Sequence, residues 1–506
     1  MSGLYDELKK LQNGSDIRGI AMDGVPGEAR NLTDSAAKLL TRGFVVWLEG
    51  HTGKAATELT VAIGRDPRLS GEALAKDAAA VMTASGVKVI NCGLASTPAM
   101  FMSTQFAETN CDGAIMITAS HLPWNRNGFK YFTKDGGLDK PDIAKLIEYA
   151  AKSEDVKAAD SVPAADNQLM ELYAAHLREL IIKGVAMGDT PLSGLHIVVD
   201  AGNGAGGFFA AKVLAPLGAD LTGSLYLEPD GHFPNHAPNP EDKAAMRAIS
   251  TAVLEAKADL GIIFDTDVDR SAAVDENGRE IARNGIVAMA AALIAGNHPG
   301  TTVVTDSITS DFLPEFLENR LGLRHLRFKR GYKNVINKAI ELNAAGTDCQ
   351  LAIETSGHAA YKENYFLDDG AYLATKIVIR AAQLHHEGKG ISTVISELSE
   401  PAEAREVRIP VLAEDFATAA EEVLTGLKAY VAETGTALTL VEPNYEGVRI
   451  HFDEGHGDGW CLLRKSLHDP LMPLNLESNT AGGTDVMASI LRRFLEKYTA
   501  LDISKL

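Results

Sequence analysis

The sequence predicts an α/β protein with three related α/β domains, whose mixed sheets are mostly parallel, and a smaller C-terminal α+β domain. Two observations support this prediction. The chain has 506 residues, which suggests three or four domains at roughly 150 residues per domain. The order of apolar strand, turn and Ala-rich helix occurs three times, whereas the C-terminal part shows a different, alternating pattern.

Each repeat begins with a continuous apolar run, passes through a turn that contains Gly or Asp, and ends in a helical pattern. Continuous apolar strands that alternate with helices are typical of parallel sheets covered on both faces. The repeats are too degenerate to prove a duplication. The apolar runs are Leu59–Ile63, Leu195–Val199 and Thr301–Thr305, and the helical patterns are Gly71–Ser85, Gly207–Leu217 and Asp311–Leu321.

The domain boundaries follow from changes in composition along the chain. The polar segment Lys152–Asp166 predicts a surface connection, and Asn284-Gly285 opens a new apolar helix. Gly388–Gly390 and Pro401 precede the last domain. We therefore expect domains at residues 1–160, 161–284, 285–402 and 403–506.

The last of these domains has its own pattern. Alternating strands at Val407–Val411 and Glu446–Phe452 flank a helical stretch at Ala413–Glu433. Alternation of apolar and polar residues is typical of strands with one buried face. This pattern predicts an antiparallel sheet packed against a helix.

The composition is that of a globular protein with an acidic balance: 45% of residues are apolar, 23% are charged, and the net charge is −20. This charge disfavours nonspecific binding to nucleic acid or to an anionic membrane. An acidic protein that binds an anionic substrate needs a locally positive cleft. A phosphate site must therefore be built from a few placed cations, backbone amides and a metal.

The cysteines and the N-terminus bear on the compartment. The four cysteines lie far apart without a CxxC pair, and residues 1–10 contain two acids and no apolar core of a signal peptide. No apolar run approaches the roughly 20 residues that span a bilayer. We expect a reduced, cytoplasmic protein without a zinc site or a disulfide framework.

The apolar run Ala114–Ile117 ends in a polar turn that displays Ser120, His121 and Lys130. The end of such a strand is the usual place for functional groups in an α/β sheet. A serine can carry a phosphoryl group where a base removes its proton and cations stabilise the transferring group. Taken alone, the pattern also fits a turn in which Ser120 or Thr118 caps a helix.

The apolar strand Leu260–Phe264 runs directly into three alternating carboxylates, Asp265, Asp267 and Asp269, followed by Arg270. In an extended chain, alternation places the three carboxylates on one side, where they supply hard oxygen ligands to a divalent cation. Without a cation the clustered negative charges would repel one another, which disfavours a purely structural role. Arg270 could orient the cluster or neutralise it.

Two further strands, Leu351–Ile353 and Gly459–Leu463, also end in polar loops. The first loop offers hydrogen bonds to sugar hydroxyls, although an ordinary turn explains it as well. The second is a cationic turn that fits a phosphate cradle or a solvated surface loop. Their polar residues are Glu354, Thr355, Ser356 and His358 in the first loop and Arg464, Lys465, Ser466 and His468 in the second.

Taken together and in this order, four segments resemble the loops of the α-D-phosphohexomutase superfamily, the phosphoglucomutases and phosphomannomutases. The resemblance covers nearly the whole chain, and supporting segments at Gly64–Ser70 and Ser96–Pro98 fall in the same order. The four segments are Thr118–Pro123, similar to the phosphoserine loop, Asp265–Arg270, similar to the metal loop, Glu354–His358, similar to the sugar loop, and Arg464–Pro470, similar to the phosphate loop.

This resemblance implies four domains around a central cleft, each contributing one loop. It implies a phosphohexomutase that interconverts the 1-phosphate and the 6-phosphate of glucose or mannose through phosphorylated Ser120 and a bisphosphorylated sugar. Mg²⁺ would be the cofactor and a sugar 1,6-bisphosphate the activator. The partners would be hexose phosphates, without nucleic acid or membrane, and the protein would be a monomer or homodimer.

The resemblance also implies roles for particular residues. Phosphoryl transfer is largely a matter of positioning and charge stabilisation, which the metal and the cations would supply. The catalytic residues would be Ser120, His121, Lys130, Arg18 and Lys333; the metal ligands Ser120, Asp265, Asp267 and Asp269; and the substrate-binding residues Arg270, Glu354, Ser356, His358, Arg464, Ser466 and His468.

The sequence departs from the family pattern at several positions. Leu122 stands where the family has Asn, beside the expected phosphoserine. Leu467 and His468 replace the usual Gly-Thr, and Pro473 falls where a further phosphate-binding Arg is often found. These departures alter the phosphate cradle and leave the preferred hexose open.

Two other functions are compatible with parts of the sequence. Asp265 also fits the nucleophile of haloacid-dehalogenase-like phosphatases, with Thr305, Lys329 and Asp368-Asp369 following in the required order. That hypothesis leaves Ser120 and the last domain unexplained. A non-catalytic sugar-phosphate-binding homologue would explain the altered phosphate loop, but the retained serine, aspartates and lysine argue against it.

Overall fold

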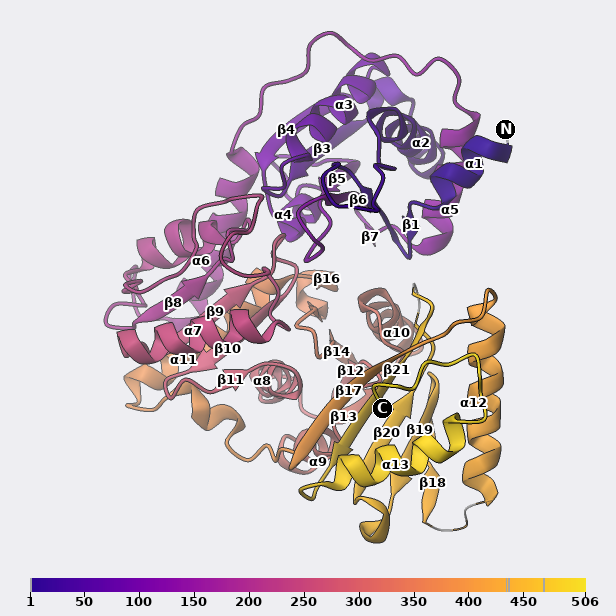
Figure 1. Cartoon of the computed structure of the whole chain (residues 1–506). Helices are drawn as coiled ribbons and strands as arrows, with labels where there is room; N and C mark the ends of the chain where they lie inside the picture. The colour runs from indigo at the N-terminus through magenta and orange to yellow at the C-terminus, as the bar shows by residue number, and fades with distance from the viewer. Residues whose placement is uncertain (1, 434, 436, 467–468) are drawn as a thin grey trace. The chain divides into compact units, whose positions relative to one another are not determined.

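The computed structural model describes the whole chain except Met1, Thr434, Thr436, Leu467 and His468 (Figure 1). The chain forms two compact units. The first comprises Met1–Leu293 and Ser356–Val394, and the second comprises Ile294–Thr355 and Ile395–Leu506. None of the described helices combines the length and apolar character needed to cross a membrane.

The first sheet of the first unit is mixed, as predicted, and its strands follow the order β1-β2-β6-β5-β3-β4, with β7 paired to β6. Its antiparallel pairs outnumber its parallel ones, so the expectation that parallel pairs predominate does not hold for this sheet. Strand β3 runs parallel to both β4 and β5, whereas β6 is antiparallel to β5 and to β2. The strands are β1 (Gln12–Asn13), β2 (Asp16–Ile20), β3 (Thr60–Arg65), β4 (Lys88–Leu94), β5 (Gly113–Ile117), β6 (Arg126–Thr133) and β7 (Gly136–Gly137).

Helices α2 and α5 pack together beside this sheet, and α3 packs against α2 and β3 (Figure 1). Their apolar faces join the strands in one buried core that includes Leu40, Phe44, Leu146 and Ile147. The helices that accompany the sheet are α1 (Ser2–Lys9), α2 (Asp34–Thr52), η1 (Ala56–Glu58), α3 (Gly71–Ala84), α4 (Thr97–Met102) and α5 (Lys140–Lys152).

The second sheet of the first unit has the order β11-β10-β9-β8, with β8 parallel to β9 and the other pairs antiparallel. Its strands are β8 (Ile197–Asp200), β9 (Leu260–Phe264), β10 (Ser271–Asp275) and β11 (Glu280–Ile281). Helices α7 and α11 contact these strands, and α6 packs on α11. The helices are α6 (Gln168–Val185), α7 (Lys243–Ala256), α8 (Asn284–Ala295) and α11 (Gly370–His386).

The helix predicted after β8 is present but irregular. It forms a widened π-helical turn, η2 (Phe209–Leu214), followed by the 3₁₀ turn η3 (Ala215–Leu217). The remaining short elements of the first unit are β15 (Ala359–Tyr361), η5 (Lys362–Asn364) and β16 (Leu367–Asp368). Strand β15 pairs antiparallel with β16.

The second unit contains the parallel strands β13, β12 and β14, with α10 packed on β12 and β14. The helix predicted after β12 is again divided into a short α-helix and a π-helical turn. These elements are β12 (Thr302–Thr305), α9 (Phe312–Glu315), η4 (Phe316–Arg320), β13 (Arg324–Arg327), α10 (Tyr332–Ala344) and β14 (Cys349–Ile353). The short turn η6 (Ile391–Ile395) includes the last residues of the first unit.

The C-terminal part confirms the predicted α+β pattern. Its sheet is antiparallel with the order β17-β21-β20-β19-β18, and α12 and α13 pack on it around one apolar core. The elements are β17 (Glu403–Pro410), α12 (Phe416–Glu433), β18 (Leu438–Leu440), β19 (Val448–Phe452), η7 (Glu454–His456), β20 (Gly459–Leu463), β21 (Leu471–Ser478) and α13 (Gly483–Leu495).

Two glycines of α2 differ in their surroundings, and the difference shows how closely this helix approaches α5. A Cβ on Gly43 would lie 2.5 Å from the Leu146 carbonyl oxygen and 2.9 Å from the Ala150 nitrogen, whereas a Cβ on Gly50 meets nothing within 4 Å. We expect Gly43→Ala to destabilise the protein by about 1–3 kcal/mol because the helices must move apart.

Gly50→Ala is the matched control in the same helix. It should leave stability unchanged or raise it by about 0.5–1 kcal/mol, since Ala loses less backbone entropy than Gly. Urea unfolding of both variants measures the difference. Equal stabilities for the two variants would contradict the close packing of α2 against α5.

Candidate functional site

Ser120 lies in the loop between two strands of the first sheet, β5 and β6. It is 3% exposed, and its φ of 50° is in the left-handed region that residues other than Gly rarely adopt. Its backbone N–H donates to Thr118 Oγ1 at 2.9 Å. Because the next element is a strand, the alternative interpretation of Ser120 or Thr118 as a helix cap is wrong.

The three aspartates occupy the tight loop between β9 and β10. One carboxylate oxygen from each of Asp265, Asp267 and Asp269 lies within 4.8 Å of the others, and all three side chains are buried. The prediction that they gather on one side is therefore confirmed, but the loop is not extended. Val268 has a φ of 69°, an unusual conformation for a β-branched residue, and this turn brings Asp269 back to its neighbours.

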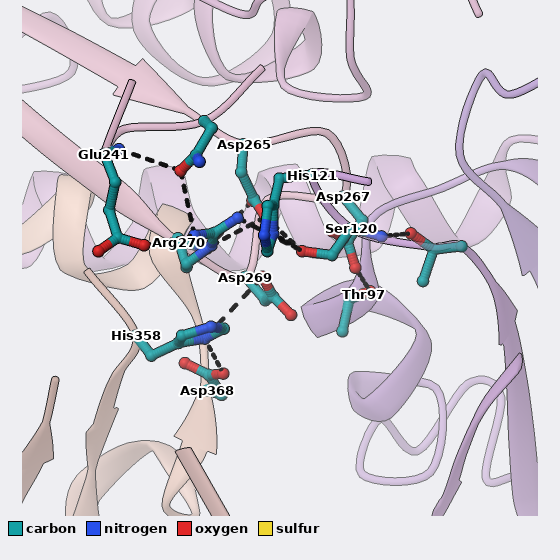
Figure 2. A network of polar contacts seen from close by, with 12 residues as sticks. Thr97, Ser120, His121, Glu241, Asp265, Asp267, Asp269, Arg270, His358 and Asp368 are labelled. Atoms are coloured by element: carbon teal, nitrogen blue, oxygen red, sulfur yellow. Dashed lines mark hydrogen bonds and ion pairs between the residues drawn. The ribbon is translucent and has the colours of Figure 1, made fainter. Parts of the chain in front are cut away.

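Ser120 and the aspartate loop meet within the first unit (Figure 2). The Ser120 hydroxyl donates to Asp265 Oδ2 at 3.1 Å. Arg270 connects the same two residues, because its Nε donates to Asp265 Oδ2 at 3.1 Å and its Nη2 lies 3.4 Å from Ser120 Oγ. A nucleophilic oxygen, an acidic cluster and a buried cation thus share one site.

The burial of three neighbouring carboxylates is electrostatically unfavourable. Burial, together with the neighbouring Asp269 carboxylate, raises the pKa of Asp265 well above its usual range. Asp267 Oδ1 and Asp269 Oδ1 are buried without a hydrogen-bond partner among the described residues. Leaving buried carboxylate oxygens unsatisfied is costly, and a divalent cation would satisfy them with the ligand type that such ions prefer. The residues therefore fit a divalent cation.

Lys130, on β6, lies against this cluster. Its ammonium group forms an ion pair with Asp269 and lies 3.4 Å from Asp267 Oδ2. Burial acts to raise the pKa of Asp269, but the positive charges of Lys130, His358 and Arg270 together outweigh it and hold the pKa below its usual range. Lys130 is thus engaged with two of the candidate metal ligands.

His121 and Arg18 complete the surroundings of Ser120. His121 Nδ1 lies 3.3 Å from Ser120 Oγ. Desolvation, together with the positive charges of Arg270 and Arg18, lowers the pKa of His121, so its ring is neutral near pH 7. Arg18, on β2, donates through Nη2 to Asp16 Oδ2 at 3.0 Å.

His358 was predicted to bind substrate, and its ring lies beside Asp269 of the aspartate loop. Its Nδ1 pairs with Asp368 and is 4.0 Å from Asp269 Oδ1 (Figure 2). Burial lowers the pKa of His358, but these two carboxylates outweigh it and raise the pKa to about 9. Ser356, two residues earlier, is buried and its Oγ has no hydrogen-bond partner among the described residues.

Glu354 and Lys333 belong to the second unit. Glu354 follows β14, and its Oε1 accepts a hydrogen bond from the Gly331 nitrogen at 2.6 Å. Lys333 lies in the first turn of α10, two residues after that glycine. The structure therefore places the loop that contains Glu354 next to the segment that carries Lys333.

Arg464 and Ser466 follow β20 in the second unit. Arg464 is 8% exposed, its Nη1 lies 4.0 Å from Glu446 Oε1, and its Nε has no hydrogen-bond partner among the described residues. Ser466 Oγ accepts a hydrogen bond from the Asp469 nitrogen at 3.2 Å. His468, also predicted here, lies outside the described residues.

Four residues of the site received no role in the mutase from the sequence. Thr97, at the start of α4, donates its N–H to the Asp267 carbonyl oxygen at 2.8 Å, and its hydroxyl bonds the Asp267 carboxylate. Asp66 and Arg68 support the Ser120 loop, and Asp368 pairs with His358. Three of these residues lie in segments that resembled the family, but only tertiary contacts reveal what they touch.

Comparisons with known proteins identify the family of the chain. Models of the phosphoglucomutase/phosphomannomutase α/β/α domains I, II and III match residues 9–158, 171–278 and 283–401. A phosphomannomutase/phosphoglucomutase of Pseudomonas aeruginosa is 29% identical over 95% of this chain and 94% of its own. A phosphoglucomutase/phosphomannomutase of Thermococcus kodakarensis is 30% identical over 83% of this chain and 86% of its own.

The fold is also found among solved structures. A phosphoglucomutase/phosphomannomutase family protein from Burkholderia thailandensis superposes with a TM-score of 0.77 at 24% identity, covering 97% of this chain and 98% of its own. Fold and site together assign the molecule to the phosphohexomutases, enzymes that move a phosphoryl group within a sugar phosphate. Within them, the chain belongs to the phosphoglucomutase/phosphomannomutase family.

The acidic cluster predicts that a divalent cation stabilises the folded protein. A ligand that binds only the folded state adds about 2.7 kcal/mol at 100 times its Kd. We therefore expect MgCl₂ to raise the Tm of the wild-type protein and to leave the Tm of Asp267→Asn almost unchanged, as measured by differential scanning fluorimetry.

The exposed Asp220, whose carboxylate accepts local bonds from Thr222, provides the control. Asp220→Asn should keep the full Mg²⁺-dependent rise in Tm. A rise that survives Asp267→Asn would mean that the cation binds elsewhere.

Proposed function

We propose that this protein interconverts hexose 1-phosphate and hexose 6-phosphate, of glucose or mannose, with Ser120 as the carrier of the phosphoryl group. The observation that supports this most directly is the contact between the Ser120 hydroxyl and Asp265 Oδ2 at 3.1 Å, in an acidic cluster with unsatisfied oxygens. Relatives that cover most of the chain are named phosphoglucomutase or phosphomannomutase, which supports the same substrate class.

In this proposal phosphorylated Ser120 donates its phosphoryl group to the free hydroxyl of a sugar monophosphate. The resulting bisphosphate reorients and returns its original phosphoryl group to Ser120. Arg270 is close enough to Ser120 to compensate the charge of the phosphate, and Arg18 adds positive charge nearby. Two residues are candidates for moving the proton of the reacting hydroxyl. They are His121, whose ring is neutral, and Lys130.

Asp265, Asp267 and Asp269, with the phosphate of Ser120, would hold Mg²⁺. When bound, the ion would neutralise the charge that develops on the transferring group. A sugar 1,6-bisphosphate would act as the activator, because it phosphorylates Ser120 in enzyme that has lost its phosphate.

Substrate recognition is proposed for residues of three loops. Glu354, Ser356 and His358 would bind sugar hydroxyls, and Lys333 would assist proton transfer. Arg464, Ser466 and His468 would bind the phosphate that does not react; the buried Arg464 Nε without a partner supports this role. With the Ser120 loop and the aspartate loop, these loops would belong to four domains at residues 1–160, 161–284, 285–402 and 403–506. The protein would act in the cytoplasm as a monomer or homodimer.

The proposal predicts an acid-stable phosphoserine. Incubation with ³²P-labelled glucose 1,6-bisphosphate should label the wild-type protein on the peptide that contains Ser120. Ser120→Ala should lose the label and lose at least about 10³-fold in kcat for glucose 1-phosphate, because the group that forms the covalent intermediate is gone.

The chemistry of the label separates this function from a phosphatase that uses Asp265. A phosphoserine survives acid, whereas an acyl phosphate on aspartate is cleaved by base and by hydroxylamine. A label that hydroxylamine removes, and that remains in Ser120→Ala, would contradict the mutase. No turnover of glucose, mannose or glucosamine phosphates by a correctly folded wild-type protein would favour a non-catalytic sugar-phosphate-binding protein.

A further inference from the structure

We propose that Arg68 is the residue that positions Ser120 for phosphoryl transfer, by holding the backbone of the Ser120 loop with its whole guanidinium group. This inference rests on the proposed role of Ser120 as the phosphoryl carrier. Arg68 lies between β3 and α3, 52 residues before Ser120, and is 1% exposed.

All five N–H groups of the Arg68 guanidinium are engaged. Nη2 donates to the carbonyl oxygens of Ser120 and Leu122, the latter at 2.7 Å. Nη1 donates to the carbonyl oxygens of Pro123 at 2.7 Å and Arg126 at 3.1 Å. Four backbone carbonyls of one loop therefore converge on a single side chain.

The fifth N–H group links Arg68 to a second support of the same loop. Arg68 Nε donates to Asp66 Oδ2 at 3.1 Å, and Asp66 Oδ2 also accepts the Thr118 hydroxyl at 2.7 Å. Thr118 Oγ1 in turn accepts the Ser120 N–H at 2.9 Å. Asp66 and Arg68 thus hold Ser120 from its N–H side and from its carbonyl side.

Such a double support is what the conformation of Ser120 requires. A left-handed residue other than Gly costs of the order of 1–3 kcal/mol and persists only where its surroundings determine it. With its N–H and its carbonyl oxygen both fixed, Ser120 keeps the φ of 50° that directs its hydroxyl to Asp265.

A loop from the second sheet covers Arg68 and keeps it buried. The Phe233 ring lies against the guanidinium group, with its centroid 5.2 Å from Cζ. A Cβ on Gly231 would lie 2.3 Å from the Pro67 carbonyl oxygen, so the cover makes close backbone contact beside Arg68. In this buried setting the hydrogen bonds of Arg68 are not exchanged for bonds to water.

Only arginine offers this arrangement. Its planar group presents five donors in a fixed fork, whereas lysine presents three donors around one point. Arg68→Lys keeps the positive charge beside Asp66 but cannot reach four carbonyl oxygens. The substitution therefore separates the fork geometry from the charge.

Arg68→Lys is expected to lower kcat for glucose 1-phosphate by about 100-fold, since small misplacements of a reacting group have effects of this size. The KM should change by less than about threefold, because the described hydrogen-bond partners of Arg68 include no residue proposed to bind the sugar. In hydrogen exchange, the amides of residues 119–126 should exchange faster than in the wild type.

Gly43→Ala is the matched control. It loosens the packing of helix α2 against helix α5 beside the same sheet, at a position whose neighbours lie on α5 and not in the Ser120 loop. At equal loss of Tm, Gly43→Ala should keep its kcat while Arg68→Lys does not. If both variants lose activity in proportion to their loss of stability, Arg68 has only a structural role and the inference fails. It also fails if folded Arg68→Lys keeps the kcat of the wild type.

A second variant covers the case in which Arg68→Lys does not fold. Asp66→Asn with Arg68→Met replaces the buried ion pair by neutral groups of similar size, a change that buried pairs commonly tolerate. It should show the same loss of kcat at nearly unchanged KM; an unchanged kcat overturns the inference.

Arg68→Ala should in addition recover part of its kcat in millimolar guanidinium chloride but not in equal ammonium chloride. The same recovery of kcat with both salts would contradict the requirement for the planar guanidinium group.

Failure of the proposed function would look different. A wild-type protein that never forms an acid-stable phosphate on Ser120 contradicts the mutase itself, whatever Arg68 does. If the wild-type protein is phosphorylated on Ser120 and turns over substrate, the mutase function stands. If Arg68→Lys is then equally active, only the inference about Arg68 is contradicted.

Discussion

The burial of three carboxylates in one tight loop is the constraint on which the rest of the first unit depends. Asp265, Asp267 and Asp269 repel one another and are shielded from water, so they persist only with compensating charge. Arg270 and Lys130 supply part of it as direct ion pairs. The carboxylate oxygens that remain without partners among the described residues are ligands of the type that a hard divalent cation prefers.

The same constraint organises the neighbouring elements. Thr97 at the start of α4 bonds both the backbone and the side chain of Asp267, and His358 approaches Asp269 while it pairs with Asp368. The Thr97 hydroxyl and the His358 ring thereby orient carboxylates that could otherwise rotate. Orientation of ligands by further hydrogen bonds is how proteins set the geometry of a metal site.

Each of the two loops that meet contains one residue in a strained backbone conformation. Ser120 and Val268 are both left-handed, with φ of 50° and 69°, and both are buried. The rigid mixed sheets and Arg68 hold the first conformation, and the hydrogen bond from the Gly370 nitrogen to the Val268 carbonyl oxygen at 3.1 Å helps to hold the second. Leu122 departs from the family pattern, yet its contact with Arg68 uses the backbone carbonyl, so this departure leaves the support of the loop intact.

The sequence by itself determined the fold class, the family and the loops of the candidate site, because each loop follows a continuous apolar strand and its residues are neighbours in the chain. The clustering of Asp265, Asp267 and Asp269 could be predicted for that reason. The π-helical turn at Phe209–Leu214 could not be, since its residues have the same apolar spacing as an ordinary helix.

Only the tertiary structure decided how these loops are supported. Three sets of contacts join residues that are 52 to 145 positions apart in the chain. They are the bond between Ser120 and Asp265, the ion pair between Lys130 and Asp269, and the bonds from Arg68 to four carbonyl oxygens. Such contacts depend on which strand ends lie together after the sheets have packed. The spacing of residues along the chain records local geometry alone, and it carries no information about that packing.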